Sequence, residues 1–318
     1  MTRRVVLLFL DGVGLGPDNA NRNALAAARL PVLRGLLDGR APVSESAPYR
    51  GRRASLVGLD ARLGVDGLPQ SGTGQAALLT GRNAPREYGR HFGPWVPAVL
   101  RPLLRTESLL ARARAGGRTV AFANAYPEEL TRATAPGAAL PSDAAGPGWR
   151  RAAQYLNAGP PLAAAGADAL TRHTAQLARG EAVASEITND GWRERLQREE
   201  VPRIEPADAG RNLARIARAH DLTLFAHYAT DYAGHTGRLD EAVAAIERVD
   251  AFLDGLLDGA GPDTTLLVVS DHGNLEDCTG GHTLNPALAL ATGAGHSQLT
   301  QNWASLLDVT PSILAWLS

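Results

Sequence analysis

The chain has 318 residues and a formal net charge of −1, with 44% hydrophobic and 20% charged residues. This is ordinary globular usage, which excludes an intrinsically disordered chain, and the length suits one or two α/β domains. A charge balance this close to zero gives no general attraction to nucleic acid or to an anionic membrane, so neither is expected as a partner.

All 32 basic residues are arginine, because the sequence contains no lysine. A Schiff base and a P-loop lysine are therefore excluded, and an anionic substrate must be held by arginine, metal or backbone. The single cysteine, Cys278, excludes a disulfide framework and a CxxC metal site. With no apolar run of about 18 residues and no signal-peptide pattern near Met1, we expect a cytoplasmic protein.

Continuous apolar runs predict four buried parallel strands and a weaker fifth strand. In chain order these runs are Val5–Leu10, Thr119–Ala123, Leu222–Ala226, Thr265–Ser270 and the weaker Ala287–Ala291. Helical patterns separate them, such as the 3.6-residue spacing of apolar side chains from Leu239 to Leu256. Alternating strands and helices predict an α/β fold with a doubly wound, mostly parallel sheet and helices on both faces.

Residues 128–205 differ from the rest of the chain, being rich in Ala, Pro and Gly and without a clear strand. We expect a small, mainly helical cap here, inserted between core halves at residues 1–127 and 206–318. The expected helices lie around Trp149–Leu156, Ala163–Leu177 and Trp192–Glu199. The alternative is a long ordered excursion of a single domain.

Side chains that can bind metal follow three of the four clear strands. They are Asp11 after the first strand, Asp231 and His235 after the third, and Asp271 and His272 after the fourth, with His282 shortly beyond. Ligands of open α/β sheets bind outside the carboxyl ends of the strands, so these side chains are expected to converge. One Asp after a strand is usually a turn or a helix cap, but three such places favour a metal site.

The donor types predict two metal ions. Carboxylate and imidazole ligands without thiolate suit Mn²⁺ or Zn²⁺, whereas an all-oxygen set suits Mg²⁺. Six ligands are too many for one ion, but two ions about 3.5–4 Å apart would use them all, and such pairs stabilise phosphoryl transfer. Asp231 and His235 are four residues apart, so a helix would turn both to one side.

Ser71 is the candidate nucleophile. It lies in the segment LPQSGTGQAALLTG at residues 68–81, after a proline turn and before small residues that can begin a helix. The N–H groups of such a helix start would face a phosphate, and a metal would lower the hydroxyl pKa. The alternative is that Ser71 or Thr73 is an ordinary helix cap; Thr73 is also the second candidate nucleophile.

Taken together, these stretches resemble the alkaline phosphatase superfamily, and more closely its metalloenzyme branch, which includes cofactor-independent phosphoglycerate mutase and phosphopentomutase. The matching stretches are LFLDGVG, QSGTGQAALLTG, ATDYAGHTG, SDHGNLED and GHTLNP, within residues 1–127 and 206–318. The resemblance implies one metal held by Asp11, Ser71, Asp271 and His272 and a second held by Asp231, His235 and His282. It also implies that Ser71 becomes phosphorylated and passes the phosphoryl group to water or to an alcohol.

Two departures from the mutases favour hydrolysis of a small phosphate ester. The mutases have a Gly-His pair where this chain has Gly74-Gln75, and their cap is much longer than the insertion expected here. Without that cap, water competes more readily for the phosphoenzyme. A phosphomutase of the phosphoglycerate or pentose phosphate type, a phosphodiesterase and an inactive metal- or phosphate-binding protein stay open, as do the substrate and the oligomeric state.

Four further residues are candidates for substrate binding. Arg90 and His91 follow the nucleophile segment and could hold the phosphate or the leaving group, or could be a plain surface pair. Asn124 lies just beyond the second strand and could line the same edge, or could be a turn residue. Thr73 lies beside the nucleophile.

Overall fold

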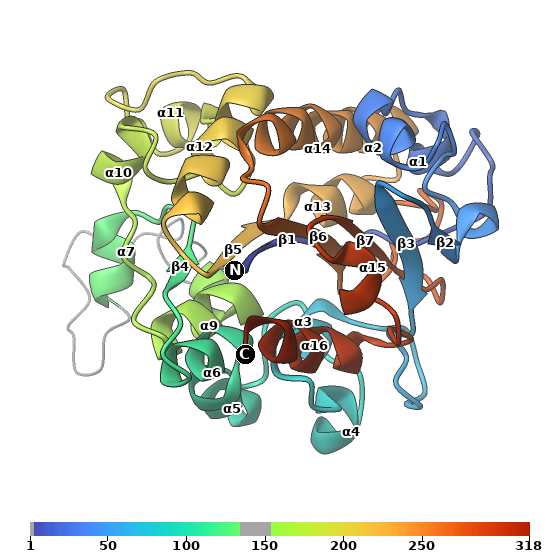
Figure 1. The fold of residues 1–318 in the computed structure, drawn as a ribbon, viewed down its shortest axis with the longest axis horizontal. Coiled ribbons are helices and arrows are strands. Elements are labelled where there is room, and N and C mark those ends of the chain that lie inside the picture. The colour runs from blue at the N-terminus through green and yellow to red at the C-terminus, as the bar shows by residue number, and fades with distance from the viewer. Residues whose placement is uncertain (1–2, 134–153) are drawn as a thin grey trace.

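A computed structural model describes residues 3–133 and 154–318 of the chain. One seven-stranded sheet crosses the described part, in the order β2-β3-β7-β6-β1-β5-β4 (Figure 1). The strands are β1 (Arg4–Leu10), β2 (Tyr49–Arg50), β3 (Ala54–Leu59), β4 (Val120–Phe122), β5 (Leu222–His227), β6 (Thr264–Ser270) and β7 (Ala287–Gly293).

The four strands expected from the clear apolar runs are confirmed. β4, β5, β1 and β6 are neighbours in the sheet and pair in parallel. The weaker fifth run is β7, which pairs antiparallel with β6 and with β3. The sequence did not predict β2 and β3. Buried Ser55 and half-buried Gly58 interrupt the apolar run of β3, and a Cβ on Gly58 would lie 2.8 Å from the Pro286 ring.

Alternate side chains of β1 enter two hydrophobic layers, one on each face of the sheet. Val5, Leu7 and Phe9 belong to one layer, and Val6, Leu8 and Leu10 belong to the other. The first layer includes α3 (Ser71–Thr80), α4 (Ala84–Tyr88), α5 (Arg101–Glu107), α6 (Leu109–Ala115), α9 (Gly159–Gly166) and α16 (Val309–Leu317). The second includes α1 (Ala24–Ala27), α2 (Pro31–Leu36), α12 (Pro206–Arg218), α13 (Ala229–His235) and α14 (Leu239–Gly259). The expected α/β fold with helices on both faces is confirmed (Figure 1).

The remaining elements are short. They are α7 (Glu128–Ala133), α10 (Thr174–Ala178), α11 (Asp190–Glu194), α15 (His296–Leu299) and the 3₁₀ turns η1 (Ser44–Ser46), η2 (Ala98–Leu100), η4 (Tyr155–Asn157) and η5 (Leu306–Asp308). Within the expected insertion, α9 joins the layer of α3, α5 and α6. Leu177 of α10 and Trp192 of α11 instead belong to a small separate hydrophobic cluster that includes Val201. The boundaries at 127/128 and 205/206 stay a prediction.

Two of the helices expected in the insertion are wrong in extent. α9 ends at Gly166, where a Cβ would lie 2.0 Å from the Arg105 carbonyl oxygen, and Asp168 has a positive φ of 47°. The chain becomes helical again only at Thr174. α11 spans Asp190–Glu194 rather than 192–199, since Gln197 has a φ of 53°. Residues 149–153 of the first expected helix lie outside the described residues.

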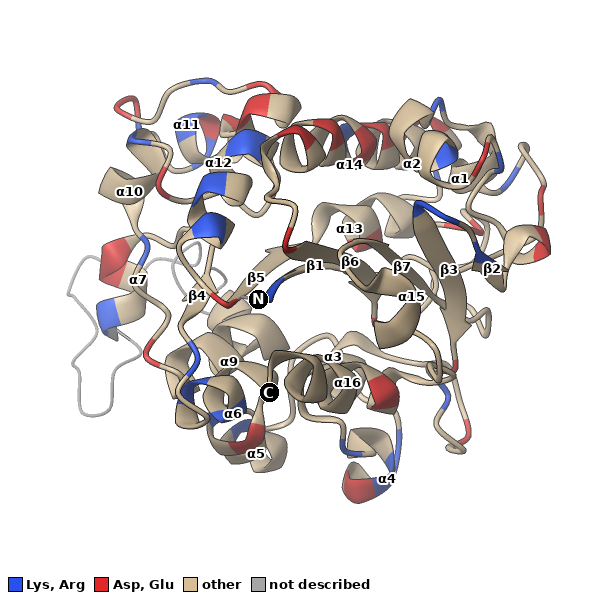
Figure 2. Cartoon of the chain, viewed as in Figure 1, with Lys and Arg blue, Asp and Glu red and all other residues tan. Residues whose placement is uncertain are grey.

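α12 carries mainly basic residues and α14 mainly acidic residues, whereas the strands are mostly uncharged (Figure 2). This arrangement follows from burial, because the strands are covered on both faces while these helices turn one side to solvent. Within residues 3–133 and 154–318, no helix combines the length and the apolar character that a membrane crossing needs.

Candidate metal centre

The predicted ligands meet at the carboxyl edge of the central strands. Asp11 follows β1, and Asp271 and His272 follow the neighbouring strand β6. β5, on the other side of β1, leads into α13, which carries Asp231 and His235. His282 lies in the loop before β7. The sheet order β6-β1-β5 therefore brings together residues that are up to 271 positions apart.

Ser71 is the first residue of α3 and lies among these ligands. Its Oγ is 3.0 Å from His272 Nε2. The small residues beside it are required by close packing, because a Cβ on Gly72 would lie 2.2 Å from the Trp95 carbonyl oxygen and one on Gly74 would lie 3.0 Å from the Asp271 carbonyl oxygen. The SGTG pattern thus allows the start of α3 to approach the ligand loop.

Asp11, Asp271 and His272 form one buried ligand group. Their potential ligand atoms all lie within 4.8 Å of one another. His272 Nε2 is 3.3 Å from Asp11 Oδ1 and 3.7 Å from Asp271 Oδ2. Both of these carboxylate oxygens are buried, and neither accepts a hydrogen bond. Such oxygens carry a large desolvation cost unless a cation lies beside them.

Asp231, His235 and His282 form the second, more exposed group. His235 Nε2 lies 3.3 Å from Asp231 Oδ2 and 3.1 Å from His282 Nε2, and His282 Nε2 lies 3.6 Å from Asp231 Oδ1. The helix α13 turns Asp231 and His235 to one side, as their spacing predicted. The two groups are adjacent, because the His272 and His282 rings stack with centroids 4.0 Å apart.

Hydrogen bonds outside the two groups fix how the ligands point. His282 Nδ1 donates to the Pro69 carbonyl at 2.8 Å, and His272 Nδ1 donates to the Gly273 carbonyl at 3.2 Å. Both rings consequently turn Nε2 toward the centre. Asn274 Nδ2 donates to Asp231 Oδ1 at 2.7 Å. No role for Asn274 or Pro69 could be predicted from the sequence, because their partners are remote along the chain.

Gln75, singled out in the sequence as a departure from the mutases, holds Asp11. Its Nε2 donates to Asp11 Oδ2 at 3.1 Å, and its Oε1 accepts the N–H of Gly159, the first residue of α9, at 2.9 Å. The second bond fixes the orientation of the amide, since only the Nε2 end can then face Asp11. Asp11 therefore keeps Oδ1 free for a cation.

The buried group carries an excess of negative charge. Burial, and then the charge of Asp231, raises the pKa of Asp11; burial, and then the charge of Asp11, raises the pKa of Asp271 well above its usual range. Burial opposes a charged ring, yet the surrounding carboxylates, Asp271 foremost, raise the pKa of His272 to about 10. In the metal-free chain the protonated His272 ring therefore offsets part of this negative charge.

The pKa values of the outer group move in different directions. Burial favours a neutral carboxyl, yet the hydrogen bond from His235 and the charge of His272 lower the pKa of Asp231 to about 2. The same hydrogen bond raises the pKa of His235. Burial and the charge of His272 lower the pKa of His282 to about 4, so its Nε2 is a neutral ligand atom at pH 7.

These residues fit divalent cations. In the described part of the chain, the ion pairs of Asp11, Asp231 and Asp271 involve only histidine, so no arginine balances their three charges. The two buried oxygens without hydrogen bonds point to cations that replace protons in the same space. Oxygen and imidazole donors without sulfur suit Mn²⁺ or Zn²⁺.

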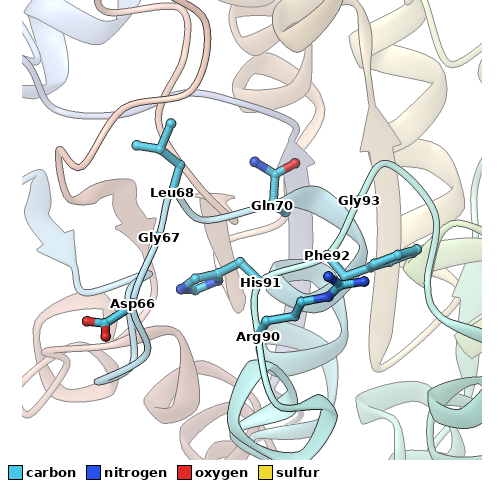
Figure 3. Close-up of a pocket in the computed structure, with 8 residues that line it drawn as sticks. All are labelled: Asp66, Gly67, Leu68, Gln70, Arg90, His91, Phe92 and Gly93. Atoms are coloured by element: carbon cyan, nitrogen blue, oxygen red, sulfur yellow. The ribbon is translucent and has the colours of Figure 1, made fainter.

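Two adjoining cavities open at the site. One of about 470 Å³ is lined by Ser71, Asp231, His235 and His282, together with Leu68, Gln70 and Gly93. The other, of about 390 Å³, shares Leu68, Gln70 and Gly93 with the first and adds Asp66, Arg90, His91 and Phe92 (Figure 3). A ligand at Ser71 could therefore extend toward Arg90.

The four candidate substrate residues have different environments. Arg90 is exposed, and its guanidinium carbon lies 5.9 Å from the ring centroid of Tyr88 and 5.9 Å from that of Phe92. His91 lines the same cavity, but its Nε2 donates to the Val65 carbonyl, and burial lowers its pKa. Arg90 is thus the freer of the two for an anion.

Asn124 and Thr73 are already engaged in structural hydrogen bonds. The Asn124 amide donates to the Ala226 carbonyl at 2.7 Å and accepts the Ala226 N–H at 2.8 Å, which joins β4 to β5. Asn124 itself forms a parallel β-bridge with Val183, so the alternative of a turn residue is wrong. The Thr73 hydroxyl accepts the Phe92 N–H at 3.1 Å. Thr73 therefore holds the loop that contains Phe92, whereas the Ser71 hydroxyl lies beside the predicted metal ligands.

Similarity to known proteins supports the resemblance seen in the sequence. A stretch of 103 residues is 36% identical to the 2,3-bisphosphoglycerate-independent phosphoglycerate mutase of Desulforudis audaxviator, and it covers 30% of this chain and 20% of the mutase. The chain thus spans about a fifth of the length of that curated relative.

Solved structures share the fold over nearly the whole chain. The PH0037 protein of Pyrococcus horikoshii superimposes with a TM-score of 0.55 at 13% identity, covering 100% of this chain and 97% of that one. Alkaline phosphatase from the Antarctic bacterium TAB5 gives 0.51 at 14% identity, covering 99% and 97%. The sequence matches the Metalloenzyme superfamily over residues 3–318, and the chain therefore belongs to this superfamily.

Proposed function

We propose that the chain is a metal-dependent phosphoryl-transfer enzyme that hydrolyses a small phosphate ester through a phosphoserine at Ser71. One observation carries the proposal: the Ser71 hydroxyl lies 3.0 Å from His272 Nε2, at the first residue of a ten-residue helix, between two groups of metal-competent side chains. A cytoplasmic location is part of the same proposal.

Two divalent cations, Mn²⁺ or Zn²⁺ with Mg²⁺ as the third candidate, would supply Lewis-acid stabilisation of the attacking and leaving oxygens. Asp11, Ser71, Asp271 and His272 would hold one cation, and Asp231, His235 and His282 would hold the other. The Nδ1 hydrogen bonds of His272 and His282 keep both Nε2 atoms turned toward these positions.

Ser71 performs the bond-making step. Its Oγ attacks phosphorus opposite the ester oxygen and loses its proton. The ester P–O bond breaks with its electron pair going to the alcohol oxygen, which takes up one proton and departs as the alcohol. The positive end of the α3 dipole favours the phosphoryl group at this position. Water then attacks the phosphoserine, which releases phosphate and restores the hydroxyl. Arg90, in the adjoining cavity, is placed to hold an anionic part of the substrate.

A phosphomutase is the second candidate function. It is favoured by the curated relative that matches about 30% of the chain, which is named a phosphoglycerate mutase. In that case the phosphoryl group would return from Ser71 to another hydroxyl of the substrate. Hydrolysis is preferred because the chain has Gln75 in place of the mutase histidine and a much shorter insertion, so water has easier access to the phosphoenzyme.

The proposal is tested by incubating protein loaded with Mn²⁺, Zn²⁺ or Mg²⁺ with a panel of phosphate monoesters and diesters. Free phosphate and rearranged product are measured together. Hydrolysis is supported by phosphate release that Ser71→Ala abolishes and Thr73→Val retains. Rearranged product instead favours the mutase, and full activity of Ser71→Ala excludes Ser71 as the nucleophile.

A further inference from the structure

Glu276 is a buried carboxylate that accepts hydrogen bonds from four groups. Its Oε2 accepts the backbone N–H groups of Gly14 and Asn274, each at 2.8 Å. Its Oε1 accepts from the Thr283 hydroxyl and from Asn285 Nδ2, the latter at 3.1 Å. Four donors occupy about all the acceptor positions of a carboxylate, so the side chain is held in one orientation.

The four donors come from three segments that carry the predicted metal ligands. Gly14 lies three residues after Asp11. Asn274 lies two residues after His272. Thr283 directly follows His282. One carboxylate therefore joins the loops after β1 and β6 to the loop before β7.

Glu276 also reaches the remaining helix of the site through Asn274. Its Oε2 accepts the Asn274 backbone N–H, while the side-chain amide of the same asparagine donates to the Asp231 carboxylate at 2.7 Å and to the Asp231 carbonyl at 3.1 Å. The outer ligand group is thereby connected to Glu276 through Asn274 and Thr283, and the buried group is connected to it through the loops that carry Asp11 and His272.

Three glycines make room for the Glu276 side chain. A Cβ on Gly14, Gly16 or Gly273 would lie 2.4, 2.8 or 2.2 Å, respectively, from a Glu276 side-chain atom. The cradle excludes a side chain at each of these positions. Glu276 is 1% exposed, and within the described residues no arginine or histidine forms an ion pair with it. Its charge is stabilised by hydrogen-bond donors alone. Glutamine has one acceptor oxygen and one NH₂ group, so it cannot accept from all four donors.

We infer that Glu276 is a positioning residue that fixes the two ligand groups relative to each other, so that the affinities of both cations depend on this one carboxylate. The inference rests on the ligand assignment of the proposed function. The groups that support metal ligands through hydrogen bonds change metal affinity by about 10- to 100-fold when they are replaced. A carboxylate shared by both groups should change both affinities together.

Glu276→Gln is the direct test, because it keeps the size of the side chain but replaces one acceptor oxygen with an NH₂. If that NH₂ faces Gly14 and Asn274, it meets two N–H donors; if it faces the other way, it meets Thr283 and Asn285. Asp277→Asn is the matched control, since it removes the same charge one residue along the loop, where the Asp277 carboxylate accepts hydrogen bonds from Thr279. Thr283→Val is a milder variant that removes one donor to Oε1.

The first readout is amide hydrogen exchange of the metal-free chain. Glu276→Gln should speed exchange at Gly14 and Asn274, and Asp277→Asn should leave both unchanged. The second readout is calorimetric titration with Mn²⁺ alone. Both Mn²⁺ equivalents should weaken about 10- to 100-fold in Glu276→Gln, and Thr283→Val, which removes one donor to Glu276, should weaken both to a smaller extent.

Wild-type exchange at Gly14 and Asn274, or weakening of a single equivalent in Glu276→Gln, overturns the inference. If Glu276→Gln does not fold, Thr283→Val decides: weakening of both equivalents supports the inference, and unchanged Mn²⁺ binding or weakening of a single equivalent overturns it. Neither readout uses a phosphate ester. A wild type that binds two Mn²⁺ but acts on no phosphate ester would therefore rule out the proposed function and leave this inference standing. If the wild type is active and the Glu276→Gln variant binds both cations normally, this inference is overturned and the proposed function stands.

Discussion

Replacement of Gln75 by leucine should destabilise the metal-free protein, because Gln75 connects Asp11 to the start of α9. The side chain is 1% exposed. It donates to Asp11 Oδ2 and accepts from the Gly159 N–H. Leucine fills a similar volume but does neither, so a buried carboxylate oxygen and a buried backbone N–H both lose their partner.

The size of the effect follows from these two contacts. A hydrogen bond to a charged group contributes about 1.5–3 kcal/mol, and a stranded buried donor costs about 1–3 kcal/mol. Allowing for relaxation of the surrounding chain, we expect the free energy of unfolding to fall by about 3 kcal/mol. Urea unfolding followed by circular dichroism should show a lower midpoint with an unchanged m-value.

Gln298→Leu is the matched control, since the same substitution is made on the exposed side of α15. Its free energy of unfolding should stay within about 0.5 kcal/mol of the wild type. A Gln75→Leu variant that is equally close to the wild type would refute the role assigned to these two hydrogen bonds. Gln75→Glu separates them, because it still accepts from Gly159 but places a second carboxylate beside Asp11.

Three further predictions follow from the geometry. Gly12 has a φ of +68°, and a Cβ there would lie 2.4 Å from Asp231 Oδ1, so Gly12→Ala should weaken Mn²⁺ binding about tenfold by calorimetry; Gly39→Ala, at a φ of +86° in open space, should not. Burial lowers the pKa of His227 to about 4, so its contribution to stability is present above pH ~6.5 and is lost as the pH falls toward 4. At pH 5 this loss is about 2 kcal/mol in urea unfolding, and His227→Gln should show a shallower pH dependence; equal slopes contradict the assignment. Saturating Mn²⁺ should raise the melting temperature of the wild type, with about 2.7 kcal/mol per site at a hundredfold excess over Kd, and Asp271→Asn should reduce the rise.

The strands that carry the site could be predicted because they are buried on both faces and read as continuous apolar runs. β3 could not be found in this way. Its Ser55 is buried through a hydrogen bond to His296 Nδ1, 241 residues away, and this partner is invisible to a local pattern. The helix expected at 163–177 failed because the chain leaves the helical conformation after Gly166 and Asp168 adopts a positive φ of 47°.

The same limit applies to the site. Asp and His residues after three strands could be identified, because parallel strands bring their carboxyl ends to one edge. Asn274 and the hydrogen bonds of Gln75 could not be assigned, since their partners come from other elements. Asn124 is the instructive case: its position after a strand suggested the site, but the amide joins β4 to β5.

The central claim is that Ser71 receives the phosphoryl group, and acid-quenched tandem mass spectrometry tests it most directly. Metal-loaded protein is mixed with a small phosphate ester, quenched during turnover and digested, and the phosphorylated residue is located in the peptide that contains both Ser71 and Thr73. We predict a phosphoryl group on Ser71 that disappears in Ser71→Ala. A phosphoryl group on Thr73, or phosphate release without any phosphorylated peptide, would contradict the account.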